Sequence, residues 1–191
     1  MHTRTRFSTP VGDVRMSRLL DTADISRALK RLAHEVIEAN HGADRLVVLG
    51  IQTRGVPLAK RLADLIGQIE DVEIPSGSVD VTLYRDDLAT QAPRPLLQTH
   101  LPVDLDDKIV VLVDDVLFTG RTIRAALDSL LEYGRPEAIR LVVLVDRGHR
   151  ELPIRADHVG KNIPTALAQR VSVKVAEIDG EDAVDIEEGE E

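Results

Sequence analysis

Residues 110–122 constrain the fold of this chain more than any other segment. The segment begins with four consecutive apolar residues, which are typical of a strand buried on both faces of a parallel sheet. Two carboxylates, Asp114 and Asp115, follow where we expect this strand to end. After a short loop of small residues, the apolar spacing of residues 123–131 predicts a helix.

The loop between the acids and the helix has the composition of a phosphate-binding turn. Backbone N–H groups at a helix N-terminus attract phosphate, and the hydroxyls of Thr119 and Thr122 add donors on either side of Gly120. The carboxylates of Asp114 and Asp115 can hold sugar hydroxyls directly or beside a divalent cation. Together these features predict a binding site for a phosphorylated sugar.

Two other interpretations fit parts of the same segment. Phosphoacceptor receiver domains also have a strand that ends in an acid pair, but they lack the Thr-Gly-x-Thr loop found here. An ordinary strand-to-helix turn also favours Gly and Thr as caps. We favour the sugar-phosphate site because the acid pair and the loop occur together.

Composition narrows the class of protein. A chain of 191 residues is long enough for one domain with a full core, which must be aliphatic because only 2% of the residues are aromatic. The absence of cysteine excludes disulfides and thiolate metal sites, and fits a reducing compartment. No apolar run has membrane-spanning length, and the polar N-terminus lacks a signal-peptide core. We therefore expect a cytoplasmic protein with no membrane partner.

The net charge of −9 is unevenly distributed. Residues 177–191 contain nine acids and neither Lys nor Arg, which leaves 24 acidic residues elsewhere to balance the 24 basic ones. The rest of the chain is therefore neutral. A basic patch for nucleic acid is not excluded by the acidic total.

The remaining sequence alternates predicted helices with buried strands. This order predicts a mostly parallel sheet covered on both faces, with ligand loops at the carboxyl ends of the strands. The predicted domains are an N-terminal arm (1–20), one globular domain (21–186) and a frayed acidic tail (187–191). The predicted elements are a short strand near 11–17, a helix from 21 or 22 to about 40, and strands 46–51, 79–83, 139–145, 171–175 and 183–186, with a helix from Pro57 to about Ile69.

Two loops join the phosphate-binding turn as candidate site segments. After strand 46–51, Gly55 allows the backbone to approach a ligand and Arg54 can meet a phosphate oxygen. Residues from about 85 to 100 form a long polar loop inside a compact domain, and such loops are usually functional or disordered. We interpret this loop as a mobile lid.

Cations gather in two places. Arg27, Lys30, Arg31 and His34 share one face of the first helix, a pattern that a solvated surface also explains. Residues 149–162 are predicted to be irregular and are rich in cations.

With these motifs, the chain resembles the type I phosphoribosyltransferases, whose phosphoribosyl-pyrophosphate signature is similar to Val110–Thr122. It more closely resembles the bacterial pyrimidine operon attenuation proteins, which are also uracil phosphoribosyltransferases. Many phosphoribosyltransferases have a small residue at the position of Phe118. An aromatic residue at this position resembles this subfamily. The resemblance covers about Asp21 to Ile186, and its most specific segments are 51–55, 80–88, 114–122 and 144–157.

The resemblance implies a fold, a reaction and a set of residues. The fold is the α/β type I phosphoribosyltransferase fold, a central mostly parallel sheet flanked by helices, with a small hood from the terminal segments. The reaction joins uracil to phosphoribosyl pyrophosphate with Mg²⁺, giving UMP and pyrophosphate. The implied catalytic residues are Arg85, Asp114 and Asp115, and the last two also hold the metal. The implied substrate-binding residues are Thr53, Arg54, Gly55, Val116, Leu117, Phe118, Thr119, Gly120, Arg121, Thr122, Arg147 and Val171.

The resemblance also implies that the protein binds pyrimidine-operon leader mRNA under the control of UMP or UTP, as a homodimer or homotetramer. Lys30 differs from the family pattern, because the best-known members have a threonine at this position. Two alternatives stay open: a phosphoribosyltransferase for another base without RNA binding, and a basic helix face buried in an oligomer contact. The implied RNA-binding residues are Arg27, Lys30, Arg31, His34, His149, Arg150, Arg155 and Lys161.

Overall fold

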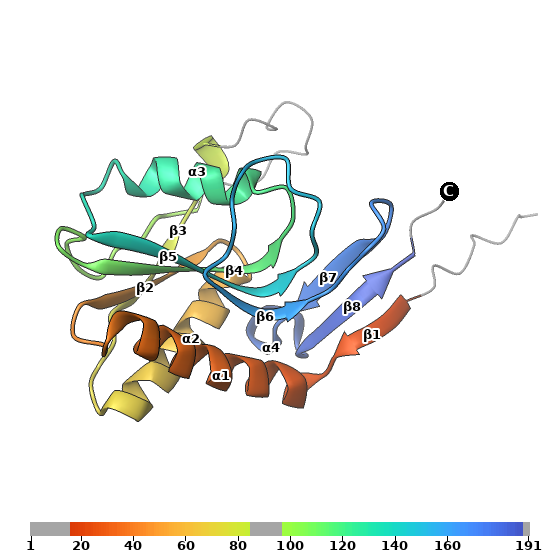
Figure 1. Cartoon of the computed structure of the whole chain (residues 1–191), viewed down its shortest axis with the longest axis horizontal. Helices are drawn as coiled ribbons and strands as arrows, with labels where there is room; N and C mark the ends of the chain where they lie inside the picture. The colour runs from red at the N-terminus through yellow and green to blue at the C-terminus, as the bar shows by residue number, and fades with distance from the viewer. Residues whose placement is uncertain (1–15, 85–96, 189–191) are drawn as a thin grey trace, which may run out of the picture.

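The computed structural model describes residues 16–84 and 97–188, which form two sheets (Figure 1). A five-stranded parallel sheet has the order β3-β2-β4-β5-β6, and a three-stranded antiparallel sheet has the order β1-β8-β7. The predicted fold class is confirmed. The elements are β1 (Met16–Leu20), α1 (Thr22–Asn40), β2 (Leu46–Ile51), α2 (Gly55–Glu70), β3 (Ser76–Val79), a 3₁₀ turn η1 (Thr82–Tyr84), β4 (Ile109–Leu117), α3 (Arg121–Leu130), β5 (Ala138–Asp146), β6 (His158–Asn162), β7 (Arg170–Lys174), α4 (Ala176–Asp179) and β8 (Ala183–Glu187).

The large sheet separates two apolar cores. Helices α1 and α2 cover one face and α3 covers the other (Figure 1). Along β4, Val111 and Val113 point to the first core, while Val110 and Leu112 point to the second. Both faces of the central strands are therefore buried, which explains why their sequences are continuously apolar instead of alternating.

Local sequence signals set the bounds of α1. The Asp21 carboxylate accepts a hydrogen bond from the Asp24 N–H (2.8 Å), and the Asp24 carboxylate accepts one from the Asp21 N–H (3.2 Å). This reciprocal capping box satisfies two backbone donors at the start of the helix. At the other end, His41 adopts a left-handed conformation (φ 56°) and the helix stops. The predicted bounds of this helix are confirmed.

The predicted strand 79–83 is wrong. The strand of this region is β3, which ends at Val79, and residues 82–84 form the η1 turn. The Asp80 carboxylate accepts hydrogen bonds from the N–H of Thr82 (3.0 Å) and from its hydroxyl (2.6 Å), and these bonds turn the chain. Burial matches the apolar alternation only in part, since Val79 and Val81 are buried whereas Leu83 is 69% exposed.

Three other boundaries also differ from the predictions. Strand β4 continues through the acid pair to Leu117, and α2 begins at Gly55, two residues before Pro57. The segment 149–162 is not irregular throughout, because its last five residues form β6. Among the described strands it pairs with β5 alone, and its side chains are mostly polar, so no apolar pattern reveals it. Residues 11–15 of the predicted first strand lie outside the described part of the chain, and β1 begins at Met16.

The three-stranded sheet, together with α4 and the turns that join β7 to β8, is the predicted hood. It lies beside the carboxyl-terminal ends of β4 and β5 (Figure 1). Ion pairs attach it to the rest of the molecule: Arg61 of α2 binds both Glu177 and Asp182. Many of the acids that dominate the C-terminal charge are therefore partnered.

Candidate functional site

The phosphate loop, residues 116–122, lines a cavity of about 320 Å³ at the end of β4, which we call the phosphate cavity. Asp114, Ile123 and Glu151 complete its lining. Gly120 precedes α3 with a φ of 93°, and a Cβ there would lie 3.3 Å from the Cβ of Ile154. The sharp turn that presents the start of α3 to the cavity therefore favours glycine. All seven predicted residues of this loop are brought together.

The two acids are adjacent in the chain, and Asp114 is one of the residues that line this cavity. Asp114 is buried, and its carboxylate accepts a hydrogen bond from the Asp115 N–H (2.9 Å). The Asp115 carboxylate accepts one from the Val116 N–H (2.8 Å). Loss of water around the Asp115 carboxylate raises its pKa, although its bonds to Asp114 and Val116 and the charge of Arg54 oppose this. A cation beside this carboxylate would therefore favour its ionised form.

The loop after β2 meets the acids from the neighbouring strand. Gly55 begins α2 against β4, and a Cβ at this position would lie 2.6 Å from the Val113 carbonyl oxygen, so no larger residue fits without a shift of the backbone. The preceding Gln52–Thr53 peptide is cis. Thr53 is exposed at the turn. The charge of Arg54 acts on Asp115, which shows that the two predicted site loops converge.

Arg54 is held by the hood. Its Nε donates to one carboxylate oxygen of Asp179 (3.0 Å) and its Nη2 donates to the other (2.7 Å). These bonds raise the pKa of the Arg54 guanidinium and lower the pKa of the Asp179 carboxyl. The sequence did not reveal this contact, because the two residues are 125 positions apart.

Arg147 and Phe118 form a stacked pair beside the phosphate loop. The guanidinium carbon of Arg147 lies 4.2 Å from the centre of the Phe118 ring, a cation–π arrangement. Arg147 is buried, and burial lowers its pKa. Its Nη2 donates to the Ala166 carbonyl (3.2 Å), whereas its buried Nε makes no hydrogen bond with the residues that the structure describes. Val171, the other predicted base-side residue, is half-buried in β7 of the hood.

The segment 146–155 is fastened to the phosphate loop. The N–H of Arg147 donates to the Leu117 carbonyl (3.1 Å), and the N–H of Glu151 donates to the Thr119 carbonyl (3.0 Å). Between them, Nη1 of Arg150 donates to the Phe118 carbonyl (2.7 Å). Three successive carbonyls of the loop are thus held by one segment.

Arg150 makes further bonds inside the protein. Its Nε donates to the Ile154 carbonyl (3.0 Å), and its Nη2 is paired with Asp146. Only 22% of its side chain is exposed. The sequence predicted a cation for RNA at this position and gave no sign of this internal role, because the partners are mostly main-chain carbonyls.

The predicted cations of α1 lie next to β6. The guanidinium of Arg31 donates to the carbonyls of Val159 (3.1 Å) and Gly160 (2.6 Å). A shallow cavity of about 300 Å³ between the two elements is lined by Arg27, Arg31 and Lys161, among others. We call the exposed cations of α1, segment 146–155 and β6 the basic surface. Its members are Arg27, Lys30, Arg31, His34, His149, Arg155 and Lys161.

His149 and Arg155 belong to the segment that contacts the phosphate loop. Both are exposed, and the His149 ring contacts the Phe118 ring edge-on with centroids 6.1 Å apart. Its Nε2 lies 2.7 Å from the Thr165 carbonyl oxygen. One side of this segment therefore touches the phosphate loop while other side chains reach solvent.

The predicted catalytic Arg85 and residues 85–96 of the predicted lid lie outside the described part of the chain. The flanks of this loop are joined by Asp80. Its carboxylate binds Thr82 on one side and accepts the N–H of Leu97 (2.7 Å) on the other.

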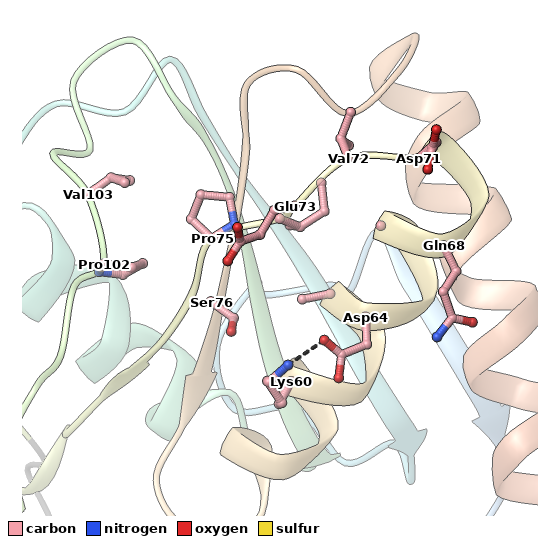
Figure 2. Close-up of a pocket in the computed structure, with 13 residues that line it drawn as sticks. Lys60, Asp64, Gln68, Asp71, Val72, Glu73, Pro75, Ser76, Pro102 and Val103 are labelled. Carbon is pink, nitrogen blue, oxygen red and sulfur yellow. Dashed lines mark hydrogen bonds and ion pairs between the residues drawn. The ribbon is translucent and has the colours of Figure 1, made fainter.

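A third cavity, of about 950 Å³, lies away from these residues (Figure 2). It is bounded by α2, the turn before β3 and the chain at Pro102, and its Lys60 is paired with Asp64. It adjoins the amino end of β3, whereas ligands of open α/β sheets bind at the carboxyl ends. No predicted site residue lines it.

The chain matches the phosphoribosyl transferase domain family over residues 15–177. It is 58% identical over 169 residues to the bifunctional protein PyrR of Deinococcus radiodurans, covering 88% of this chain and 92% of the relative. It is 57% identical over 173 residues to the bifunctional protein PyrR of Thermus thermophilus, covering 90% and 96%. The hypoxanthine phosphoribosyltransferase of Trypanosoma cruzi shares the fold, with a TM-score of 0.68 at 21% identity over 91% of this chain and 97% of that one.

The match to this domain family, together with the parallel sheet, defines the chain as a phosphoribosyltransferase. The chain belongs to the PyrR family of bifunctional phosphoribosyltransferases. The predicted family and the predicted enzyme class, a phosphoribosyltransferase, are confirmed by this membership. Within residues 16–84 and 97–188, none of the helices has the length and apolar character needed to cross a bilayer.

Proposed function

We propose that residues 114–122 bind phosphoribosyl pyrophosphate and that the enzyme transfers its phosphoribosyl group to uracil. The observation that carries this assignment is the phosphate cavity, which is lined by Asp114 of the acid pair and by the start of α3. The loop N–H groups and the threonine hydroxyls receive the 5′-phosphate. Asp114 and Asp115 then lie where they can bind the ribose hydroxyls.

The same residues suit the chemistry of the transfer. Cleavage of the bond between C1′ and the pyrophosphate oxygen leaves an electron-poor sugar and a departing polyanion. The acid pair stabilises the positive charge that develops on the sugar, and Arg54 stabilises the negative charge on the leaving group. Arg85 is a further proposed cation for the pyrophosphate, on the basis of the family resemblance alone.

The acid pair also fits Mg²⁺, which prefers oxygen ligands and retains several waters. Among the described residues, no third acidic or imidazole side chain joins the pair into a metal-binding group. We therefore propose that Asp114 and Asp115 contact a cation whose ligands come mainly from the substrate. When bound, Mg²⁺ neutralises the pyrophosphate oxygens.

The base is proposed to lie between the phosphate loop and the hood. In this proposal the stacked pair of Arg147 and Phe118 contacts the base on one side. The main chain near Val171 of β7 is assigned to the other side on the basis of the family resemblance. Backbone N–H and C=O groups can distinguish uracil from a purine through their hydrogen-bond pattern.

We also propose that the basic surface binds pyrimidine-operon leader mRNA, with an affinity set by UMP or UTP. The pairing of Arg31 with β6 supports this proposal, because it places cations from α1 beside those of β6. Lys30 is exposed on α1 and adds a positive charge that attracts RNA phosphates. Arg150 acts from inside the segment, because its donors are already engaged.

An enzyme assay tests the first proposal. Protein mixed with uracil, phosphoribosyl pyrophosphate and Mg²⁺ should release pyrophosphate and form UMP. Turnover with hypoxanthine or orotate, but not with uracil, would reassign the base. Asp115→Asn should lower kcat by about a hundredfold, because it removes charge stabilisation at the sugar, and an unchanged rate would remove this residue from the site.

A gel-shift titration tests the second proposal. Leader RNA should bind more tightly in the presence of UMP, and its affinity should fall as salt rises because phosphate contacts release counterions. Binding that is absent or insensitive to salt would contradict an RNA interface on the basic surface.

The oligomer is part of the proposal. We expect a homodimer or homotetramer, which light scattering during size-exclusion chromatography would measure. A monomer at assay concentration would contradict the proposed oligomer. The α1 cations would then lie on the surface of a single subunit.

A further inference from the structure

Glu151 is a carboxylate in a cavity that is built for an anion. It lines the phosphate cavity together with the phosphate loop. Its Oε2 lies 2.6 Å from Nε of Arg121, the first residue of α3. Its own N–H donates to the Thr119 carbonyl (3.0 Å), so both its side chain and its main chain are attached to the phosphate loop.

A phosphate in this cavity would conflict with Glu151. Both anions would lie near the start of α3, and both would be attracted to the guanidinium of Arg121. Like charges at such close range repel, and a guanidinium binds phosphate at least as well as carboxylate through paired N–H groups. The side chains of Arg121 and Glu151 are 40% and 51% exposed, so the Glu151 carboxylate can move toward water at little cost in desolvation.

Movement of Glu151 would reach the basic surface through the chain itself. His149 and Arg150 immediately precede it, and Arg150 holds the Phe118 carbonyl (2.7 Å). After it, Leu152 and Ile154 pack against the turn at Gly120. Glu151 therefore lies in the same segment as His149 and Arg155, two of the cations that we propose bind RNA.

We propose that Glu151 sets the affinity of the phosphate cavity and reports its occupancy to the basic surface. Without phosphate, the Glu151 carboxylate is bound to Arg121. A nucleotide 5′-phosphate binds Arg121 in its place and releases Glu151. Segment 146–155, which contains Glu151, then changes its conformation. This inference rests on the proposed function, because it takes the cavity as the UMP phosphate site. Coupling of this kind is reciprocal, so RNA changes the affinity for UMP by the same factor that UMP changes the affinity for RNA.

The first test measures UMP binding by isothermal titration calorimetry. Glu151→Gln keeps the shape and removes the competing charge, and it should tighten UMP binding by about fivefold or more. Arg121→Gln should weaken it. Asp128→Asn is the matched control: Asp128 is also 51% exposed, lies on α3 and is paired with Arg124 instead of the phosphate loop. This control should leave UMP affinity unchanged.

The second test measures the ratio of leader-RNA affinities with and without UMP. In Glu151→Gln this ratio should shrink toward one, whereas Asp128→Asn should keep the wild-type ratio. Glu151→Asp retains the charge with a shorter reach, so it should fall between wild type and Glu151→Gln, and it serves as the second variant if the glutamine form melts early.

The outcomes separate this inference from the function on which it rests. A wild-type protein that binds no UMP would contradict the proposed function. Normal UMP binding with equal affinities in Glu151→Gln and Asp128→Asn would overturn the role of Glu151. Tighter UMP binding with an unchanged RNA ratio would overturn the reporting role.

Discussion

Arg54 and Asp179 form a two-bond ion pair between the loop after β2 and the hood, with N···O distances of 3.0 and 2.7 Å. The Asp179 carboxylate also accepts the N–H of Val175 (2.8 Å), so it is fixed from its own side as well. Because the pair uses Nε and Nη2 of Arg54, the guanidinium is held in one orientation near Asp115. The hood therefore positions the cation that we assign to pyrophosphate.

Asp179→Asn should weaken the binding of phosphoribosyl pyrophosphate, because the amide cannot hold the guanidinium through two charge-assisted bonds. We expect its KM to rise by about tenfold, equivalent to about 1.4 kcal/mol, with a smaller change in kcat. Steady-state kinetics with varied phosphoribosyl pyrophosphate measures this. Asp182→Asn is the control, since Asp182 anchors the hood through Arg61 without touching Arg54. Equal KM values in the two variants would contradict a role specific to Arg54.

Arg61 should contribute strongly to stability. Its guanidinium makes four hydrogen bonds, two to Glu177 and two to Asp182, and only 24% of its side chain is exposed. Arg61→Gln should lower the free energy of unfolding by about 1–3 kcal/mol, between the values typical of exposed and buried pairs. Urea denaturation measures the loss. Lys60→Gln, which breaks the neighbouring exposed pair with Asp64, should change it by less than about 0.5 kcal/mol. Similar losses in both would show that the hood contacts do not matter.

The same ion pairs predict how stability changes in acid. The Arg61 guanidinium holds the pKa of Glu177 below its usual 4.5, and Arg54 holds the pKa of Asp179 below its usual 3.8. A carboxyl whose folded-state pKa is lowered stabilises the fold above its unfolded pKa, and this contribution is lost as the pH falls through the folded value. The melting temperature should therefore fall with pH below about 4.5. Arg61→Gln should show a shallower fall, and parallel curves would refute the assignment.

Arg150 and Arg155 should differ in how they affect RNA binding. Arg155 is exposed, so Arg155→Gln should weaken binding and reduce the slope of affinity against salt by about one phosphate contact. Arg150→Gln should weaken binding with an unchanged slope, because its guanidinium bonds main-chain carbonyls and Asp146 inside the protein. Filter binding across a salt series measures both. A reduced slope in Arg150→Gln would place its guanidinium on the RNA.

Patterns within single elements predicted much of this fold. The predicted bounds of α1 agree with the structure, and the order of helices and buried apolar strands predicted a parallel sheet covered on both faces. Because strand ends in such a sheet meet at one edge, the acid pair and the Arg54 loop could be assigned to one site.

The misses come from contacts between distant residues. Strand β6 is defined by its pairing with β5, and the turn after β3 by the Asp80 side chain, so apolar periodicity reveals neither. Asp179 and Glu151 look like ordinary surface acids in the sequence. Their partners, Arg54 and Arg121, lie 125 and 30 positions away.

The partnered acids of the hood also affect how charged molecules approach the protein. Most of the described acids between residues 177 and 185 are neutralised by Arg18, Arg54, Arg61 or Lys174. Near the hood, a polyanion therefore meets less local repulsion than the five acids between residues 177 and 185 would cause alone, because close ion pairs produce only short-range fields. The approach of phosphoribosyl pyrophosphate to Arg54 should accordingly depend little on repulsion from these hood acids.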